Sequence, residues 1–308
     1  MVVQLVKHMA QVKPENPFFI LYASRSGSTF LANELTKRFK VLVTPEFDFI
    51  THALGQYGHV SFESEAQLDS LADTISSDPK FSDLNISHST LRAMLGQLAP
   101  LTLSDAVRAI LDHYRRACGV DGYYCGIKKG SYVYHYRDLL RLFPSAKFIG
   151  LIRDGRAVFH SQKHAIGSGG GGKPMAQDVK KAARRWVRLT RLMRELELDH
   201  PEVRIINYEV LIQHTSRTMS EIGEFLGVEP SDGDERLRQY EVPARYGDDL
   251  HRNIGKNPLA ERISAWRKSL AANEIAQFEA VAGDCLVQEG YELVNANGSG
   301  SPWSRWLS

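Results

Sequence analysis

A polar loop close to the N-terminus contains residue types that bind anions. It spans residues 24–29, Ser-Arg-Ser-Gly-Ser-Thr, and is followed directly by a helical pattern. Gly27 allows a tight turn and a close approach to an anion. Ser28 and Thr29 offer hydroxyl donors, while Arg25 adds a fixed positive charge. Because N–H groups at a helix N-terminus also bind anions, the loop predicts a phosphate cradle, although Ser and Thr are ordinary helix caps as well.

This loop differs from the phosphate loop of nucleoside triphosphatases. That motif is G-x-x-x-x-G-K-[ST], in which the lysine reaches the terminal phosphates. Neither the first glycine nor the lysine is present in residues 24–29. The loop alone therefore indicates a phosphate site without indicating which nucleotide it holds.

A second group of polar residues lies near the middle of the chain. Arg153 ends an apolar run at 147–152, and Ser161 follows eight residues later in a helical pattern. The carboxyl ends of parallel strands border the crevice in which open α/β sheets bind ligands. We therefore expect Arg153 to face the same crevice as the loop, and Ser161 to reach it if the chain folds back; the alternatives are a surface ion pair for Arg153 and simple exposure for Ser161.

The elements that carry these residues alternate between strands and helices. Short apolar runs typical of buried parallel strands occur at 18–23, 123–127, 147–152 and 203–208. Helical patterns follow them, ending at about Phe39, Phe143, Lys163 and Leu226. This alternation predicts an α/β fold with a parallel central sheet flanked by helices.

Other parts of the chain extend this framework. Residues 45–125 show mainly helical patterns, as at 103–118, which indicates a helical insert at about 47–120 that shapes an acceptor site. The glycine run 167–172 is expected to be a surface loop that is either a lid or a spacer. We expect one domain over 1–294 and a flexible tail over 295–308.

Composition excludes several classes of protein. The 308 residues include 38 Lys and Arg against 36 Asp and Glu, a net charge of +2, which argues against a nucleic-acid partner. The three cysteines predict no disulfide framework and favour a reducing, cytoplasmic setting. The longest apolar run, 18–23, is far shorter than the roughly 20 residues that span a bilayer.

Together, these motifs resemble those of a known family. Residues 25–29 resemble the 5′-phosphosulfate loop of sulfotransferases, and 147–161 look like their 3′-phosphate motif, including the spacing of Arg and Ser. Residues 208–211 are similar to a segment near the adenine, and 255–267 to a C-terminal phosphate-side segment. The closest likeness is to the tyrosine-protein and bacterial branch, and the implied fold is the P-loop-like sulfotransferase fold.

The resemblance implies a donor and its contacts. Sulfotransferases take a sulfuryl group from 3′-phosphoadenosine 5′-phosphosulfate (PAPS) and release 3′,5′-ADP. No metal is expected, because Arg and Lys supply the charge and the spacings typical of zinc sites are absent. The residues that the resemblance assigns to the donor are Arg25, Ser26, Gly27, Ser28, Thr29, Arg153, Ser161, Tyr208 and Lys256.

The resemblance also implies three catalytic residues. Arg25 occupies the loop position at which cytosolic sulfotransferases carry a catalytic lysine. Lys128 matches the second catalytic lysine of the family, but no His stands two positions after it, which is where cytosolic members have their base. Glu46 matches the Glu of the tyrosine-protein enzymes, so we expect it to be the general base; the alternative is a surface carboxylate.

Sequence alone leaves two further functions and several acceptors open. One is a P-loop nucleotide or small-molecule kinase, which would share the fold, although the phosphate-loop lysine of such kinases is missing from this sequence. The other is a non-catalytic nucleotide-binding protein on the same scaffold. The expected acceptor is a hydroxyl, or an amine, of a small molecule, glycan, lipid or peptide.

Overall fold

A five-stranded parallel sheet forms the centre of the protein. The computed structural model describes residues 16–120, 122–165, 174–231 and 261–294. The sheet has the order β2-β5-β1-β6-β7, and all four pairings within it are parallel. Its strands are β1 (Phe18–Tyr22), β2 (Val41–Val43), β5 (Tyr124–Lys128), β6 (Phe148–Ile152) and β7 (Val203–Asn207). The predicted α/β class is thereby confirmed.

Strand β1 lies in the middle of the sheet and is buried on both faces, as its continuous apolar sequence predicts. Phe18, Ile20 and Tyr22 pack into one hydrophobic cluster. Phe19 and Leu21 pack into another on the opposite face. This alternation follows from the two-residue period of a strand.

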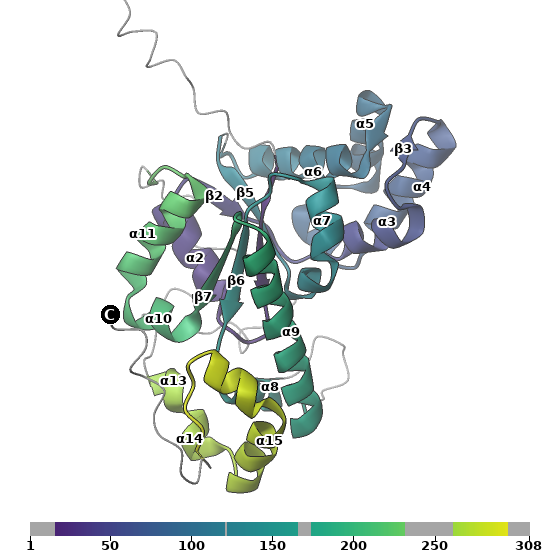
Figure 1. The fold of residues 1–308 in the computed structure, drawn as a ribbon. Helices are drawn as coiled ribbons and strands as arrows, with labels where there is room; N and C mark the ends of the chain where they lie inside the picture. The colour runs from purple at the N-terminus through teal and green to yellow at the C-terminus, as the bar shows by residue number, and fades with distance from the viewer. Residues whose placement is uncertain (1–15, 121, 166–173, 232–260, 295–308) are drawn as a thin grey trace, which may run out of the picture.

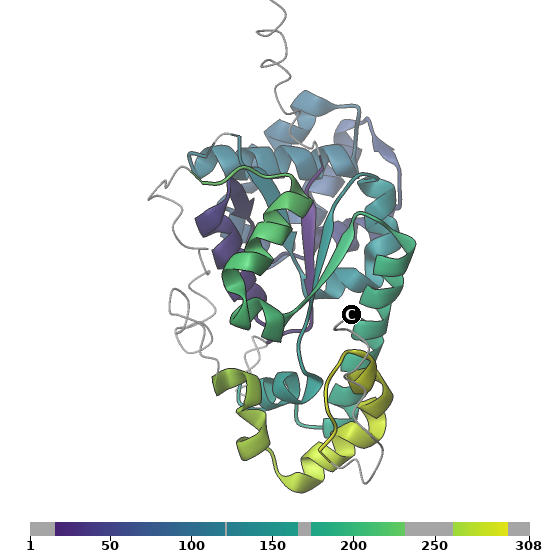
Figure 2. The same cartoon turned by 60° about the vertical axis from the view of Figure 1, so that its left-hand side comes forward.

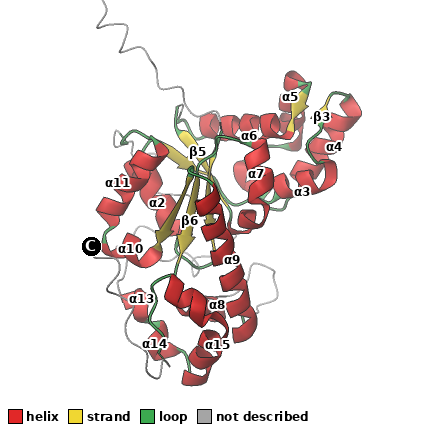
Figure 3. Cartoon of the chain, viewed as in Figure 1, coloured by secondary structure: helices red, strands yellow, loops and turns green. Residues whose placement is uncertain are grey.

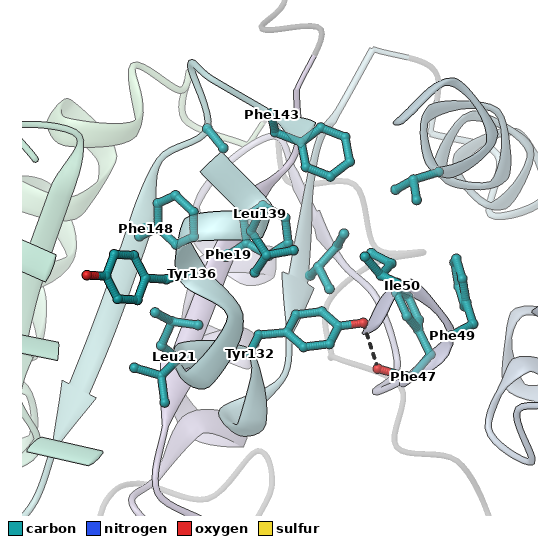
Figure 4. Packing of buried hydrophobic residues seen from close by; sticks show 14 of the residues in the cluster. Phe19, Leu21, Phe47, Phe49, Ile50, Tyr132, Tyr136, Leu139, Phe143 and Phe148 are labelled. Carbon is teal, nitrogen blue, oxygen red and sulfur yellow. Dashed lines mark hydrogen bonds between the residues drawn. The ribbon is translucent and has the colours of Figure 1, made fainter. Parts of the chain in front are cut away.

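Helices cover both faces of the sheet (Figure 1). One face carries α2 (Ser28–Arg38), α10 (Tyr208–Gln213) and α11 (Thr215–Leu226), whose apolar residues join the cluster around Phe18. The other carries a 3-10 turn (Gly130–His135), α7 (Tyr136–Leu142) and the long helix α9 (Val179–Asp199). Figure 4 shows the packing on that second face, where Phe19 and Phe148 stack.

The chain between β2 and β5 forms a mainly helical segment that projects from the sheet, as expected for residues 47–120 (Figure 3). Two small strands, β3 and β4, pair within it. Two of its amphipathic helices begin at side-chain caps, Ser64 and Thr102. The elements are α3 (Phe49–Tyr57), β3 (Ser61–Phe62), α4 (Glu65–Ser76), a 3-10 turn (Phe81–Leu84), α5 (His88–Leu98), β4 (Leu101–Thr102) and α6 (Leu103–Ala117).

The C-terminal helices gather beside α8 (Gly155–Lys163), the helix that follows β6 (Figure 2). Helices α13 (Glu261–Ser264), α14 (Trp266–Ser269) and α15 (Ala272–Gln288) each contact α8. The fully buried guanidinium of Arg156 joins them, because it pairs with carboxylates of α8's cap and of α15.

The sequence predicted none of the strands β2, β3 and β4, and one predicted helix starts differently in the structure. Strand β2 has only three residues, too few for a period to be read from the sequence. The helix expected from Ser131 to Phe143 begins as a 3-10 turn, and its α-helical part starts only at Tyr136. A Cβ on Gly130 would lie 2.2 Å from the carbonyl oxygen of Tyr22, so the chain passes close to β1 where this turn begins and requires a glycine there.

Candidate functional site

All five strands of the sheet end at or just before a residue singled out from the sequence. β1 is followed by the loop 24–29 and β2 by Glu46, β5 ends in Lys128, and β6 and β7 are followed directly by Arg153 and Tyr208. Because parallel strands end at the same edge of a sheet, these residues lie along one edge of the sheet. That edge is where open α/β sheets bind ligands.

The loop after β1 has the backbone of an anion cradle. Arg25 and Gly27 have φ angles of 76° and 93°, in the left-handed region. The Ser26 N–H donates to the Ala23 carbonyl oxygen at 3.0 Å, which closes the turn. Gly27 caps α2, and no side chain caps the first turn of that helix. The helix start is therefore open to a ligand that can accept hydrogen bonds.

Tyr208 closes the loop from the side of β7. A Cβ on Gly27 would lie 2.4 Å from a ring carbon of Tyr208, so a glycine is required at that position. The guanidinium of Arg153 also packs over the Tyr208 ring, 4.4 Å from its centroid. The predicted loop, Arg153 and Tyr208 are therefore in mutual contact.

Ser161 also reaches this group, since α8 folds back across the loop. Arg25 donates from Nε to Ser161 Oγ at 3.1 Å, and Arg153 donates from Nη1 to the Arg25 carbonyl oxygen at 3.0 Å. Gln162 Nε2 donates to the Ser24 carbonyl oxygen at 2.9 Å. Residues 136 positions apart in the sequence are thus held together by direct hydrogen bonds.

Charge at this site is strongly positive. Burial lowers the pKa of Arg25, and the neighbouring guanidiniums of Arg153 and Arg262 lower it further. Ser26 Oγ and Arg153 Nε are buried and have no hydrogen-bond partner among the described residues. Buried polar atoms normally have partners, and three clustered cations are stabilised by an anion. The site therefore fits a phosphorylated ligand.

Glu46 lies in a second group, between the ends of β1 and β5. It accepts a very short hydrogen bond from the Tyr22 hydroxyl. Lys128 Nζ donates to Glu46 Oε1 at 3.0 Å and to the Tyr22 hydroxyl oxygen at 3.4 Å. The Lys128 side chain is 4% exposed and that of Glu46 is 25% exposed, so the carboxylate is the member of the pair that solvent reaches.

The pKa of Glu46 reflects opposing effects. Burial raises it, but the charge of Lys128, the hydrogen bonds from Tyr22 and Lys128, and the charge of Lys80 together bring it down to about 2. The pKa of Lys128 is raised, because Tyr22 and Glu46 outweigh the effect of its complete burial. Glu46 is therefore an ionised carboxylate at neutral pH, as a proton acceptor must be.

A second carboxylate, Asp48, lies beside Glu46. Lys129 Nζ contacts Asp48 at 2.6 Å, and Lys80 Nζ lies 3.3 Å from Asp48 Oδ2 and 3.7 Å from Glu46 Oε2. Lys80 belongs to the helical segment and connects both carboxylates. Burial raises the pKa of Asp48, but the two lysines lower it overall.

The sequence missed three of these residues: Tyr22, Lys80 and Arg262. Tyr22 ends an apolar strand, and a hydroxyl at such an end is the only signal that it carries. Arg262 stands in the segment 255–267 that resembles a phosphate-side segment, but Lys80 stands in a region without any motif. The predicted contact Lys256, the glycine run 167–172 and the tail 295–308 lie outside the described residues.

No group of three or more His, Cys, Asp or Glu residues among the described residues could hold a metal ion. No helix in the described part of the chain is long and apolar enough to cross a membrane.

Comparison with known proteins defines the family. The model of the sulfotransferase family matches residues 17–232, so this chain belongs to the sulfotransferase family. No curated protein matches the sequence closely enough to count as a relative.

Two solved structures share the fold. The sulfotransferase domain from the curacin biosynthetic pathway aligns with a TM-score of 0.58 and 14% identity, over 90% of this chain and 99% of that one. The sulfotransferase domain from the Synechococcus PCC 7002 olefin synthase aligns with a TM-score of 0.56 and 20% identity, over 88% and 96%. The predicted family and fold are confirmed.

Proposed function

We propose that this sulfotransferase transfers a sulfuryl group from PAPS to a hydroxyl, or an amine, of its acceptor, with Glu46 as the general base. The observation that carries the proposal is the contact of Arg25, Arg153 and Ser161 at one end of the sheet. A donor that carries phosphates on the 3′ and 5′ positions of its ribose needs two neighbouring anion sites. The acceptor is a small molecule, a glycan, a lipid or a peptide, and we propose that residues 1–294 form one catalytic domain.

The donor's two phosphates would be held by different elements. Residues Arg25 to Thr29 surround the start of α2 and would bind the 5′-phosphate through N–H groups, hydroxyls and a guanidinium. Arg153 and Ser161, from β6 and α8, would bind the 3′-phosphate, with Tyr208 supporting the Arg153 guanidinium. The unpartnered atoms Ser26 Oγ and Arg153 Nε are the groups that such a ligand would satisfy.

Bound PAPS supplies the sulfuryl group: a bond forms between the acceptor oxygen and sulfur, and the bond from sulfur to the bridging phosphate oxygen breaks, leaving 3′,5′-ADP. Glu46 takes the acceptor's proton. Lys128 and Arg25 neutralise the charge that develops on the transferring group and the leaving oxygen. Such transfers depend mainly on positioning and on electrostatic stabilisation.

A carboxylate whose pKa is about 2 is a weak base, and the charge of Lys128 is the largest of the effects that lower this pKa against the opposing effect of burial. When Lys128 has a second anion to neutralise, its effect on Glu46 decreases, and the pKa of Glu46 rises toward its ordinary range. We therefore propose that Lys128 couples the arrival of the donor to the strength of the base.

Binding of 3′,5′-ADP tests the donor. We expect 3′,5′-ADP, but not ADP, to raise the melting temperature of the protein, since only the former has a 3′-phosphate for Arg153 and Ser161. Stabilisation by ADP alone would instead favour a kinase. Labelled PAPS with a broad panel of hydroxyl and amine acceptors then tests transfer; firm binding of 3′,5′-ADP without turnover would favour a non-catalytic nucleotide-binding protein.

Arg153→Ala tests the 3′-phosphate assignment. We expect a loss of roughly 10- to 100-fold in affinity for 3′,5′-ADP, the usual range for a charge-assisted contact. Arg188→Ala is the matched control, because Arg188 also lies over a tyrosine ring, that of Tyr134, but is exposed on α9. Equal affinities in both variants would contradict the assignment.

A further inference from the structure

The backbone around Glu46 is fixed from outside the sheet. Glu46 follows the end of β2 by three residues, and α3 begins at Phe49. The N–H of Thr44 donates to the Gly126 carbonyl oxygen of β5 at 2.8 Å, which is the last backbone bond of this segment to the sheet. Beyond it, two buried side chains from other elements hold residues 47–49.

The first of these side chains is Asp78, which is 2% exposed. Its Oδ2 accepts hydrogen bonds from the backbone N–H groups of Asp48, at 2.5 Å, and Phe49, at 2.9 Å. The Asp48 side chain makes no capping bond to α3. Asp78 therefore caps α3 in place of Asp48, whose carboxylate is engaged with Lys129 and Lys80 instead.

Asp78 also fixes the turn that carries Lys80. Its Oδ1 accepts a hydrogen bond from the Lys80 N–H at 2.9 Å. The ammonium of Lys80 reaches both Glu46 and Asp48. One turn of the helical segment thus contacts the segment around Glu46 through its backbone and through its charge.

The second side chain is Tyr132, which is fully buried. Its hydroxyl donates to the Phe47 carbonyl oxygen at 3.0 Å, as the dashed line in Figure 4 shows. Phe47 is itself buried and stacks on Phe49, with ring centroids 4.6 Å apart. Since Tyr132 follows Lys128 by four residues, it ties the chain next to Glu46 to the chain next to Lys128.

We propose that Asp78 and Tyr132 are positioning residues for the base: they fix residues 47–49 so that the Glu46 carboxylate stays at the Lys128 ammonium and the Tyr22 hydroxyl. This inference rests on the proposed function of Glu46. The hydrogen bonds of both side chains go to residues 47–49 and to Lys80, whereas the described residues of the proposed donor site come from the loop after β1, from α8, and from the positions directly after β6 and β7. A base acts only within hydrogen-bond reach of the proton that it takes, so a small displacement of this segment reduces turnover.

Tyr132→Phe and Asp78→Asn test the proposal. The probe reaction is the release of 3′,5′-ADP and sulfate from PAPS with water as the acceptor, which needs no known substrate. We expect kcat to fall roughly 10-fold or more in each variant while the affinity for 3′,5′-ADP stays within about twofold, and the double variant to lose less than the product of both losses because the two act on one segment.

The pH profile separates positioning from a loss of stability. Lys128, Tyr22 and Lys80 hold the pKa of Glu46 low against the effect of its burial, so a Glu46 displaced from them has a higher pKa. We expect the acid limb of kcat/KM to move to higher pH in both variants.

Matched controls exist in the same helical segment. Tyr57→Phe removes a hydroxyl that bonds to the Ser70 carbonyl oxygen at 2.9 Å, far along α3 from Glu46. Asp105→Asn weakens the cap of α6. The proposal would be overturned if Tyr132→Phe and Asp78→Asn lost no more kcat than these controls. It would also be overturned if their loss of kcat came with an equal loss of affinity for 3′,5′-ADP.

Two other outcomes would contradict the proposed function rather than the positioning role. These are the absence of any PAPS turnover by the wild type and normal turnover by Glu46→Gln, which would show that Glu46 is not the base. If Asp78→Asn does not fold, Tyr132→Phe decides alone, because it deletes a single oxygen from a ring that remains packed.

Discussion

At the scale of single residues, the proposed chemistry depends most directly on Glu46 and Lys128. Lys128 is buried at the end of β5, and its ammonium is compensated by Glu46 and Tyr22. Breaking a buried pair by removing one partner leaves the other charge uncompensated. The pair is therefore both a structural contact and, in our proposal, the base and its regulator.

Glu46→Gln is expected to reduce the rate of sulfuryl transfer at least 100-fold, the usual contribution of a general base. The affinity for 3′,5′-ADP should change little, because the donor contacts belong to other residues. Turnover with labelled PAPS and a binding titration measure the two effects. Glu195→Gln, which removes an exposed carboxylate paired with Arg137, should retain full activity, and equal activity in both variants would refute the base assignment.

The pH dependence of stability has a definite sign. The pKa of Glu46 is lowered from 4.5 to about 2 in the folded protein. Its ionised form therefore stabilises the fold above about pH 4.5, and this contribution is lost as the pH falls toward 2. Urea denaturation should show the wild type losing on the order of 3 kcal/mol more than Glu46→Gln across that window; parallel curves would contradict the low pKa.

At the scale of elements, the loop between β1 and α2 combines two backbone constraints. Gly27 has a positive φ, and the Tyr208 ring occupies the space that a side chain would need. The same compactness leaves the first turn of α2 without a side-chain cap. A helix start that no side chain caps is suited to a ligand that supplies the missing hydrogen bonds.

Gly27→Ala is expected to destabilise the fold by about 1–3 kcal/mol, because alanine is strained at this φ and would collide with Tyr208. We also expect weaker binding of 3′,5′-ADP. Gly55→Ala is the matched control, since a Cβ there meets nothing within 4 Å and lies inside α3. It should leave binding unchanged and stabilise the protein by up to about 1 kcal/mol, as urea denaturation would show.

At the scale of the whole molecule, a buried charge network joins distant parts of the chain behind the proposed donor site. Arg156 bonds to Asp154 and to Glu279 of α15, and its Nη1 donates to the Glu292 carbonyl oxygen at 2.8 Å. Its guanidinium also lies 4.1 Å from the centroid of the Trp266 ring. The turn that carries Arg153 is thereby anchored to the C-terminal helices.

Arg156→Met is expected to lower the free energy of unfolding by about 3–5 kcal/mol, since the variant leaves two buried carboxylates without their cation. Arg137→Met is the matched control: the Arg137–Glu195 pair is 66% and 46% exposed, and such pairs contribute less than about 1 kcal/mol. Denaturant titration of both variants checks the difference, and equal losses would show that the network is not a major source of stability.

Much of the fold and part of the site could be predicted from local sequence. Apolar runs predicted β1, β5, β6 and β7, and their helical continuations predicted α2, α8 and α11, because burial on both faces leaves a continuous apolar signal. Strand β2 and the 3-10 turn at Gly130 could not be predicted, since one is too short for a period and the other depends on contact with β1. Arg25, Glu46, Lys128, Arg153 and Ser161 were found through motifs.

The sequence by itself determined which strand ends carry charged and hydroxyl side chains, because those residues interrupt apolar runs. Only the tertiary structure decided how they combine: the strand order brings β1 between β5 and β6, so that Tyr22 meets Lys128 and Arg25 meets Arg153. It also brought in Lys80, Asp78 and Tyr132, which no motif marks. Their contacts with the Glu46 segment join residues far apart in the chain, and such contacts form only when the packed helices bring them together.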